Sequence, residues 1–299
     1  MLEKLQRLLG EEKVLVKEPM SLHTTFRIGG PADYYVMPSE EKELADVVKL
    51  CREEKIPYFI LGNGSNLLVG DKGYRGVVIQ LYKNFDGIVI DGEKVFAKAG
   101  AMLIRVAKEA GKAGLTGLEF ASGIPGTIGG AMVMNAGAYG GEMKDVVSSV
   151  KVLDPEGKIR TLTKDEMKFR YRGSVIEDEE YIVLEAELRL KEGNVSEIQS
   201  CMDELSLRRK TKQPLEYPSA GSTFKRPEGY FAGKLIMDSG MQGYQVGGAQ
   251  ISEKHCGFVI NKDRATAADV MKLIGDVSDR VEERFGVRLE PEVKRIGEF

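Results

Sequence analysis

The 299-residue sequence contains no tryptophan, only two histidines and only three cysteines, Cys51, Cys201 and Cys256. Cysteines this few and this widely spaced indicate neither a disulfide framework nor a metal cluster, so we predict no bound metal. No apolar run approaches the ~18 residues that a membrane helix needs, and the first residues include acids where a signal peptide would be apolar. These absences predict a cytoplasmic protein with no membrane contact.

The sequence also lacks an excess of charge of one sign. Lys and Arg total 43 against 46 for Asp and Glu, which gives a net charge of −3 without any basic block. A nucleic-acid-binding protein would carry a basic footprint, so nucleic acid is not an expected partner. With 42% hydrophobic and 30% charged residues the chain is typical of a soluble globular protein, and its length favours two or three domains.

Periodicity predicts a mixture of helices and strands. The helix after Ser39 has the apolar stripe Leu44, Val47, Val48 and Cys51, and a last helix from Thr266, with Asp269 three residues on, runs to Phe285. Further helices are expected at 2–9, 103–110 and 195–209, the last one on Val195, Ile198, Met202 and Leu205. Strands are expected at 32–38, 57–61, 76–81, 87–91, 94–99, 150–154, 158–162 and 182–191, with hairpin turns at 91–92 and 154–157. Because the two kinds of element do not alternate strictly, the predicted class is α+β, with domain boundaries near residues 60 and 195.

The first candidate motif is a Gly/Asn/Ser loop at 62–67, directly after the strand at 57–61. It lacks the third glycine of a dinucleotide fingerprint, where Leu67 stands, and a turn at 69–73 follows it instead of a helix. Such a loop can still direct successive backbone N–H groups inward as an anion-binding nest. A nest and an ordinary tight loop are both consistent with this segment.

The second motif is a glycine-rich segment with seven glycines between residues 123 and 141. We expect neither a helix nor a packed strand at this density of glycine. Flexible linkers are polar, whereas this segment contains Ile124, Ile128 and the run 132–134 of apolar residues. The pattern favours backbone that lines a large, flat ligand.

Three further residues have chemically useful side chains. Ser222 lies between a glycine and a threonine, a position that could suggest a nucleophile. The chain has only two histidines and no Gly-X-Ser-X-Gly nucleophile elbow, so a hydrolase triad is poorly supported. A serine hydroxyl can instead donate a proton if a nearby cation stabilises its alkoxide. Taken alone, Ser222 is a loop residue. The spacing of Arg172 and Glu292 in the sequence does not by itself indicate a function for either residue.

Together these segments resemble the bacterial UDP-N-acetylenolpyruvoylglucosamine reductases, flavoenzymes that make UDP-N-acetylmuramate for peptidoglycan. The matching segments occur in the family's order and cover nearly the whole chain; they are 25–30, 62–67, 123–131, 135–140, 171–174, 220–225, 247–250 and 289–293. The short stretch between Arg172 and the helix at 195 indicates the shorter, second type. Where many members carry Asn after Lys225, this chain has Arg226, so an Asn contact to the uracil is not carried over.

The resemblance implies FAD held between two N-terminal domains and substrate carried by a third. The implied domains are 1–60 joined by 289–299, then 61–194, and 195–288 as the substrate domain. Related flavoproteins attach FAD through a loop histidine, and no histidine lies between residues 24 and 254, so we expect noncovalent FAD. The resemblance further implies NADPH as the reductant and a monomer in the cytoplasm.

The resemblance also implies a role for each matching residue. The implied catalytic residues are the active-site arginine Arg172, the proton donor Ser222 and the glutamate Glu292. The implied FAD-binding residues are Arg27, Gly62, Asn63, Gly64, Ser65, Asn66, Leu67, Ser122, Gly123, Ile124, Gly126, Thr127, Gly129, Gly130, Asn135 and Gly137. The implied substrate-binding residues are Tyr171, Lys212, Lys225, Gln250 and Lys254.

Two other functions remain to be weighed against this one. An FAD oxidase of the same superfamily would react with O₂, but Arg172, Ser222 and Glu292 are residues suited to an anionic substrate. A nucleotide-binding module without catalysis is the other alternative. A yellow protein that NADPH bleaches would favour the reductase, whereas a colourless protein that binds nucleotide sugars would favour the module.

Overall fold

The computed structural model describes residues 1–299, which form two compact units. Unit 1 comprises Met1–Leu15, Tyr34–Asn63 and Val77–Arg209, and unit 2 comprises Val16–Asp33, Gly64–Gly76 and Lys210–Phe299. Each unit has a hydrophobic core of its own. The division into three domains stays a prediction.

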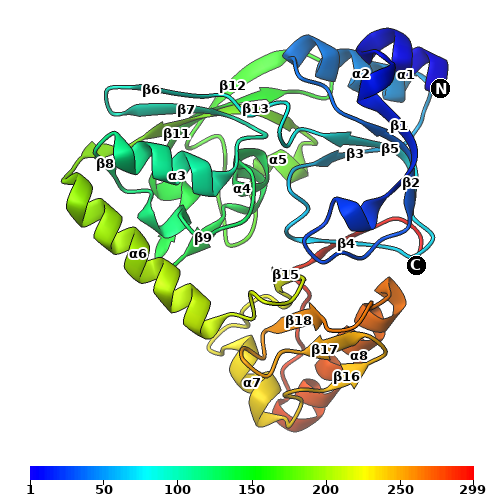
Figure 1. The fold of residues 1–299 in the computed structure, drawn as a ribbon, viewed down its shortest axis with the longest axis vertical. Helices are drawn as coiled ribbons and strands as arrows, with labels where there is room; N and C mark the ends of the chain where they lie inside the picture. The colour runs from blue at the N-terminus through cyan, green and yellow to red at the C-terminus, as the bar shows by residue number, and fades with distance from the viewer. The chain divides into compact units, whose positions relative to one another are not determined.

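The structure confirms the α+β class (Figure 1). The helices are α1 (Leu2–Leu9), α2 (Glu41–Glu53), α3 (Leu103–Lys112), α4 (Ile128–Met134), α5 (Val175–Asp178), α6 (Val195–Lys212), α7 (Ala232–Asp238) and α8 (Ala267–Phe285). The first strands are β1 (Val14–Pro19), β2 (Pro31–Val36), β3 (Tyr58–Leu61), β4 (Leu67–Val69), β5 (Tyr74–Gln80), β6 (Ile88–Asp91), β7 (Lys94–Lys98), β8 (Leu115–Thr116), β9 (Gly137–Ala138) and β10 (Gly141–Glu142). The remaining strands are β11 (Val147–Leu153), β12 (Ile159–Thr163), β13 (Ile182–Arg189), β14 (Lys191–Glu192), β15 (Ser219–Ser222), β16 (Gln245–Val246), β17 (Ala249–Ile251), β18 (Phe258–Asn261) and β19 (Lys294–Ile296).

Unit 1 is built on a five-stranded antiparallel sheet in the order β12-β11-β13-β7-β6. Both predicted hairpins are confirmed, since Asp91 pairs with Lys94 across one turn and Leu153 with Ile159 across the other. Helix α4 packs against β7 and β13. The predicted stripe of α2 is buried, although the helix begins after Glu40 rather than Ser39. A further sheet has the order β1-β2-β5-β3, and the division between the units falls within β1, β2 and β5.

Two expectations about unit 1 were wrong. The segment 123–141 contains a helix, α4, despite Gly129 and Gly130 within it, because the Thr127 hydroxyl caps its start and its apolar residues Ile128, Ala131 and Met132 are buried. Helix α6 buries only Ile198 and Met202 of its predicted stripe, while the Val195 side chain is 49% exposed. This helix therefore packs on its neighbours over a narrower face than its sequence suggested.

Unit 2 contains a four-stranded antiparallel sheet in the order β15-β18-β17-β16, together with α7 and α8, and the parallel pair β19-β4. The predicted start of α8 is confirmed by a capping box, in which the Thr266 hydroxyl accepts from the Asp269 amide and the Asp269 carboxylate accepts from the Thr266 amide. Asp71 accepts from the next amides, Ala267 and Ala268, at 2.7 and 2.9 Å. The first turn of α8 is thus fully bonded.

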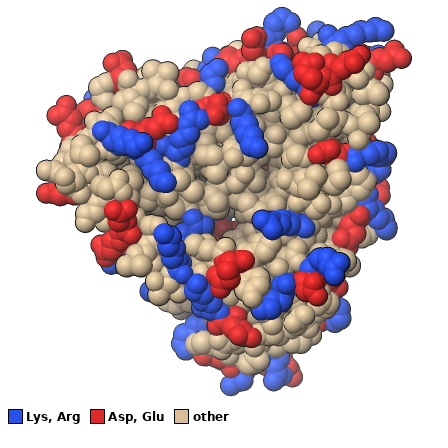
Figure 2. All heavy atoms as spheres, in the orientation of Figure 1, with Lys and Arg blue, Asp and Glu red and all other residues tan.

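No helix in the structure combines the length and the apolar character that crossing a bilayer requires. Acidic and basic side chains alternate over the face shown in Figure 2 and form no large area of one sign. This mixture agrees with the balanced composition of the sequence.

Candidate active site

A cavity of about 100 Å³ in unit 1 lies where β3 ends and α4 begins. Apolar side chains and glycine backbone form most of its wall. The lining residues are Ile60, Leu61, Gly62, Leu81, Ala99, Thr127, Gly129, Gly130, Val133, Ile176, Tyr181, Ile182 and Val183. Such a wall suits a flat, weakly polar group.

The structure brings the two glycine motifs together at this cavity. The Asn63 side-chain amide donates to the Pro125 carbonyl at 2.7 Å. A Cβ at position 62 would collide with Thr127 Oγ1, so only glycine allows this approach of the two segments. The amides of Ile128 and Gly129 donate at 2.8 Å to the carbonyls of Ala101 and Ala99, respectively. The glycine-rich segment is therefore a bonded part of unit 1 rather than a free loop.

The loop at 62–67 has the donors that a nest requires. The backbone N–H groups of five successive residues, Gly62 to Asn66, donate no hydrogen bond within the protein. Gly64 has φ +60° and is buried, and a Cβ there would collide with the His23 carbonyl oxygen. Unpaired amides in a partly buried loop favour the nest over an ordinary tight turn.

Arg172 lies in a tight turn of unit 1. Arg170 and Gly173 exchange backbone hydrogen bonds of 3.0 and 3.3 Å, and Arg172 between them has φ +54°. The Arg172 guanidinium carbon is 5.1 Å from the centroid of the Tyr171 ring, and Tyr171 is 51% exposed. The turn thus presents a cation and an aromatic ring side by side.

Asn135 joins this turn to the end of α4. Its buried side chain donates at 2.8 Å to Glu142 Oε2 and at 3.2 Å to the Arg170 carbonyl, and its Oδ1 accepts from the Lys144 amide. Sequence reasoning assigned Asn135 to the cofactor and did not single out Glu142, whose only signal was its place just after the glycine-rich segment. In the structure, the Asn135 side chain binds the backbone of Arg170 and Lys144.

Other FAD-assigned positions lie on both units. Ser122, Ile124 and Gly126 lie in the same stretch of unit 1 as Gly123, where a Cβ would approach Arg209 Cδ to 3.1 Å. Burial lowers the pKa of Arg209 from its ordinary value. Gly137 pairs with Glu142 in the β9–β10 hairpin of unit 1, while Arg27, with φ +55°, belongs to unit 2.

Ser222 and Glu292 lie on neighbouring segments of unit 2. The Glu292 amide donates to the Thr223 carbonyl at 2.7 Å, and Ser222 pairs with Phe258 at the end of β15. Asn66 also donates from its side chain to the Glu292 carbonyl, at 3.2 Å. Ser222 is exposed whereas Thr223 is buried, so the strand end presents the serine and anchors the threonine.

The predicted substrate-binding residues of unit 2 have different surroundings in the structure. Lys225 pairs with Glu290 at 3.2 Å, and Lys254 donates to the Lys210 carbonyl at 2.8 Å. The Gln250 side chain is buried and donates to the Gly243 carbonyl, which fixes a turn. Lys212 is exposed at the end of α6.

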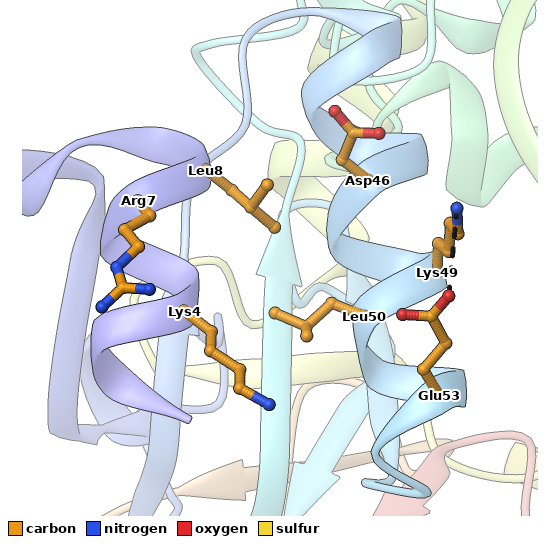
Figure 3. A pocket seen from close by; sticks show the side chains of 7 residues that line it. All are labelled: Lys4, Arg7, Leu8, Asp46, Lys49, Leu50 and Glu53. Carbon is orange, nitrogen blue, oxygen red and sulfur yellow. Dashed lines mark ion pairs between the residues drawn. The ribbon is translucent and has the colours of Figure 1, made fainter.

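A larger hollow of about 360 Å³ lies between α1 and α2 (Figure 3). It is lined by Lys4, Arg7, Leu8, Asp46, Lys49, Leu50 and Glu53. Each of its charged side chains pairs with a neighbour, as Lys49 does with Glu53 at 3.9 Å and Lys4 with Glu54. Exposed ion pairs of this kind are common on protein surfaces, so we assign no function to this hollow.

Comparison with protein families gives two matches. Residues 32–163 match a family described as an FAD binding domain. Residues 213–296 match the C-terminal domain of UDP-N-acetylenolpyruvoylglucosamine reductase. The first range contains most of the cavity wall, and the second contains Ser222 and Glu292.

Individual proteins agree with these families. UDP-N-acetylenolpyruvoylglucosamine reductase from Caldanaerobacter subterraneus subsp. tengcongensis is 55% identical over 298 residues, which cover 100% of this chain and 98% of the relative. The Clostridioides difficile reductase is 55% identical over 98% of this chain and 97% of its own. The crystal structure of the Thermus caldophilus reductase has a TM-score of 0.81 and 37% identity, and covers 95% of this chain and 98% of that chain.

Proposed function

The chain belongs to the UDP-N-acetylenolpyruvoylglucosamine reductases and is an oxidoreductase of that family, and we propose that it uses FAD and NADPH to reduce the enolpyruvyl ether of UDP-N-acetylglucosamine to UDP-N-acetylmuramate. This reaction would serve the synthesis of peptidoglycan precursors. The proposal includes noncovalent FAD, a monomeric cytoplasmic enzyme, and the three-domain division inferred from the sequence.

The residues present fit FAD. Its pyrophosphate is an anion, and the unpaired amides of Gly62 to Asn66 are donors for an anion. Its rings are flat, and the cavity beside Thr127, Gly129 and Gly130 has the apolar, glycine-lined wall that a ring needs. The unpaired amides are the single observation that best supports the proposal, because five successive backbone donors without a partner in the protein are what an anion nest requires.

The chemistry that FAD supplies when bound is transfer of a hydride from NADPH to the substrate. The protein must then stabilise the negative charge that develops on the substrate and supply a proton to it. Hydride addition at the terminal CH₂ places negative charge on the substrate carboxylate, where the permanently cationic Arg172 would stabilise it. Ser222 would deliver a proton from Oγ to the adjacent carbon, and Glu292 would orient or polarise the acid group.

The remaining polar residues would bind substrate. We assign Tyr171, Lys212, Lys225, Gln250 and Lys254 to this task. Lysines are point charges suited to the diphosphate. The buried Gln250 would act through the backbone turn that its amide holds.

A steady-state assay with NADPH and UDP-N-acetylglucosamine enolpyruvate tests the function. We expect yellow protein that oxidises NADPH only when the enolpyruvyl ether is added, with UDP-N-acetylmuramate as product. Rapid NADPH oxidation by O₂ without this substrate would indicate the oxidase instead. Colourless protein that binds UDP-sugars without turnover would indicate a binding module.

A further inference from the structure

The turn that carries Arg172 depends on contacts outside the turn itself. Its left-handed backbone, with φ +54°, is one that residues with side chains rarely adopt, so surrounding structure must hold it. The two hydrogen bonds between Arg170 and Gly173 close the turn. The Asn135 side chain then ties the Arg170 carbonyl to the end of α4 at 3.2 Å.

Glu142 helps to hold the Asn135 side chain that makes this tie. The Asn135 amide nitrogen donates to both Glu142 Oε2, at 2.8 Å, and the Arg170 carbonyl, while its oxygen accepts from the Lys144 amide at 3.0 Å. With all of these partners fixed, the amide cannot flip without losing hydrogen bonds. The carboxylate of Glu142 is therefore one of three partners that hold the amide which ties the arginine turn.

Glu142 is also ionised and lies in the field of Arg172. A hydrogen bond from Lys144, whose ammonium is 2.8 Å away, is the main cause that keeps the pKa of Glu142 below its ordinary value in spite of burial. Asn135 and the positive charge of Arg172 act in the same direction. The Asn135 amide therefore donates to a charged acceptor, and such a hydrogen bond is stronger than one between neutral groups.

We propose that Glu142 is a positioning residue for Arg172, acting through Asn135 on the turn that carries the arginine. All of these groups lie within unit 1. The inference rests on the proposed function, because Arg172 must act on the enolpyruvyl carboxylate for its placement to affect turnover. Loss of Glu142 should then slow the step that uses Arg172 and leave flavin reduction alone.

The test uses the purified holoenzyme and stopped-flow flavin absorbance for both half-reactions. In Glu142→Gln, which weakens the charge-assisted hydrogen bond to Asn135, we expect reoxidation by the enolpyruvyl substrate to slow about tenfold, as for a modest displacement of a reacting group. Reduction by NADPH, flavin content and melting temperature should stay near wild type. Glu142→Asp should retain most of the rate. Glu166→Gln is the matched control, since the Glu166 carboxylate accepts a hydrogen bond in another turn of unit 1, from the Thr163 amide.

A double-mutant cycle separates positioning from a general structural role. If Glu142 acts through Arg172, then Glu142→Gln should add no further slowing to Arg172→Ala. Additive slowing, a wild-type rate in Glu142→Gln, or joint loss of flavin and of reduction by NADPH would each overturn the inference. Normal reoxidation in Arg172→Ala would refute the proposed role of Arg172 itself, which is a different failure.

Discussion

The two units present different kinds of chemical group. Unit 1 presents mainly backbone groups to a ligand, namely a glycine-lined cavity and the unpaired amides of Gly62 and Asn63. Arg172 is its main charged residue with a proposed role. Unit 2 adds the unpaired amides of 64–66 but otherwise offers side chains, among them Ser222 and Glu292. Backbone can approach a large flat ligand closely, whereas reacting atoms need side chains that stabilise charge or move protons.

This difference implies that cofactor retention and turnover can be separated by mutation. Added bulk on the glycines of unit 1 should reduce flavin occupancy, while truncated side chains of unit 2 should reduce turnover and leave flavin in place. Each prediction below would either strengthen this contrast or remove it.

The largest effect is expected from Ser222→Ala. If Ser222 donates only the substrate proton, flavin reduction by NADPH should stay near normal while reoxidation by the enolpyruvyl substrate slows by at least ~10²-fold. Stopped-flow absorbance measures both half-reactions on one sample. Ser219→Ala, on the same strand β15, is the control and should leave both rates unchanged. Equal slowing of both half-reactions would mean that the pocket had been disturbed.

Lys212→Ala should have the next largest effect, on substrate binding alone. Loss of a hydrogen bond to a charged phosphate should weaken binding of the UDP-sugar by ~1–3 kcal/mol. Calorimetric titration of the holoenzyme measures the change. Lys234→Ala, at another exposed lysine of unit 2, should change affinity little. Flavin loss in Lys212→Ala would contradict the contrast, because it would make this lysine a cofactor residue.

Gly130→Leu tests unit 1 with a smaller effect. A Cβ at this position would meet only Thr127 Oγ1, at 3.8 Å, so the protein itself has room for the first atom of a side chain. Leucine also forms helix better than glycine by roughly 0.5–1 kcal/mol, and the apoprotein should lose no stability. The added atoms would compete with the ligand at the cavity wall, so we expect flavin affinity to fall about tenfold, or ~1.4 kcal/mol.

Flavin titration of the apoprotein, followed by fluorescence quenching, gives the affinity of Gly130→Leu. Gly275→Ala is the control, because a Cβ in this part of α8 in unit 2 meets nothing within 4 Å. Its flavin affinity should equal that of wild type. If Gly130→Leu also binds flavin normally, the cavity is not part of the cofactor site.

The sequence predicted most of the elements because their signals are local. The stripe of α2, the hairpin turns and the capping box at Thr266 depend on residues within a few positions of one another, and all three are confirmed. Helix α4 was missed because glycine content argued against it. The burial of its apolar residues and the Thr127 cap compensate for poor helix propensity, and burial depends on distant strands.

The site could be predicted only in part for the same reason. Motif spacing identified the loop at 62–67 and the glycine-rich segment, but not that Asn63 bonds to Pro125 or that position 62 admits only glycine. Glu142 had no local signal beyond its place just after the glycine-rich segment. Its significance comes from hydrogen bonds through Asn135 to Arg170, which lies 28 residues farther along the chain and meets it only in the folded unit.

The smallest effect is expected from Thr266→Ala, which should act on the stability of unit 2 alone. The substitution removes the hydroxyl that accepts from the Asp269 amide at 3.0 Å and should lower the free energy of unfolding by ~1 kcal/mol, the usual cost of losing an N-cap. Thr266→Ser keeps the acceptor and is the control. Flavin affinity and both half-reactions should match wild type, because the helix start offers no group assigned to cofactor or substrate. Urea denaturation of the apoprotein gives the stability change, and flavin titration in buffer gives the affinity. A fall in flavin affinity without denaturant would show that cofactor binding depends on the packing of unit 2, and the two units would then not be separable by mutation.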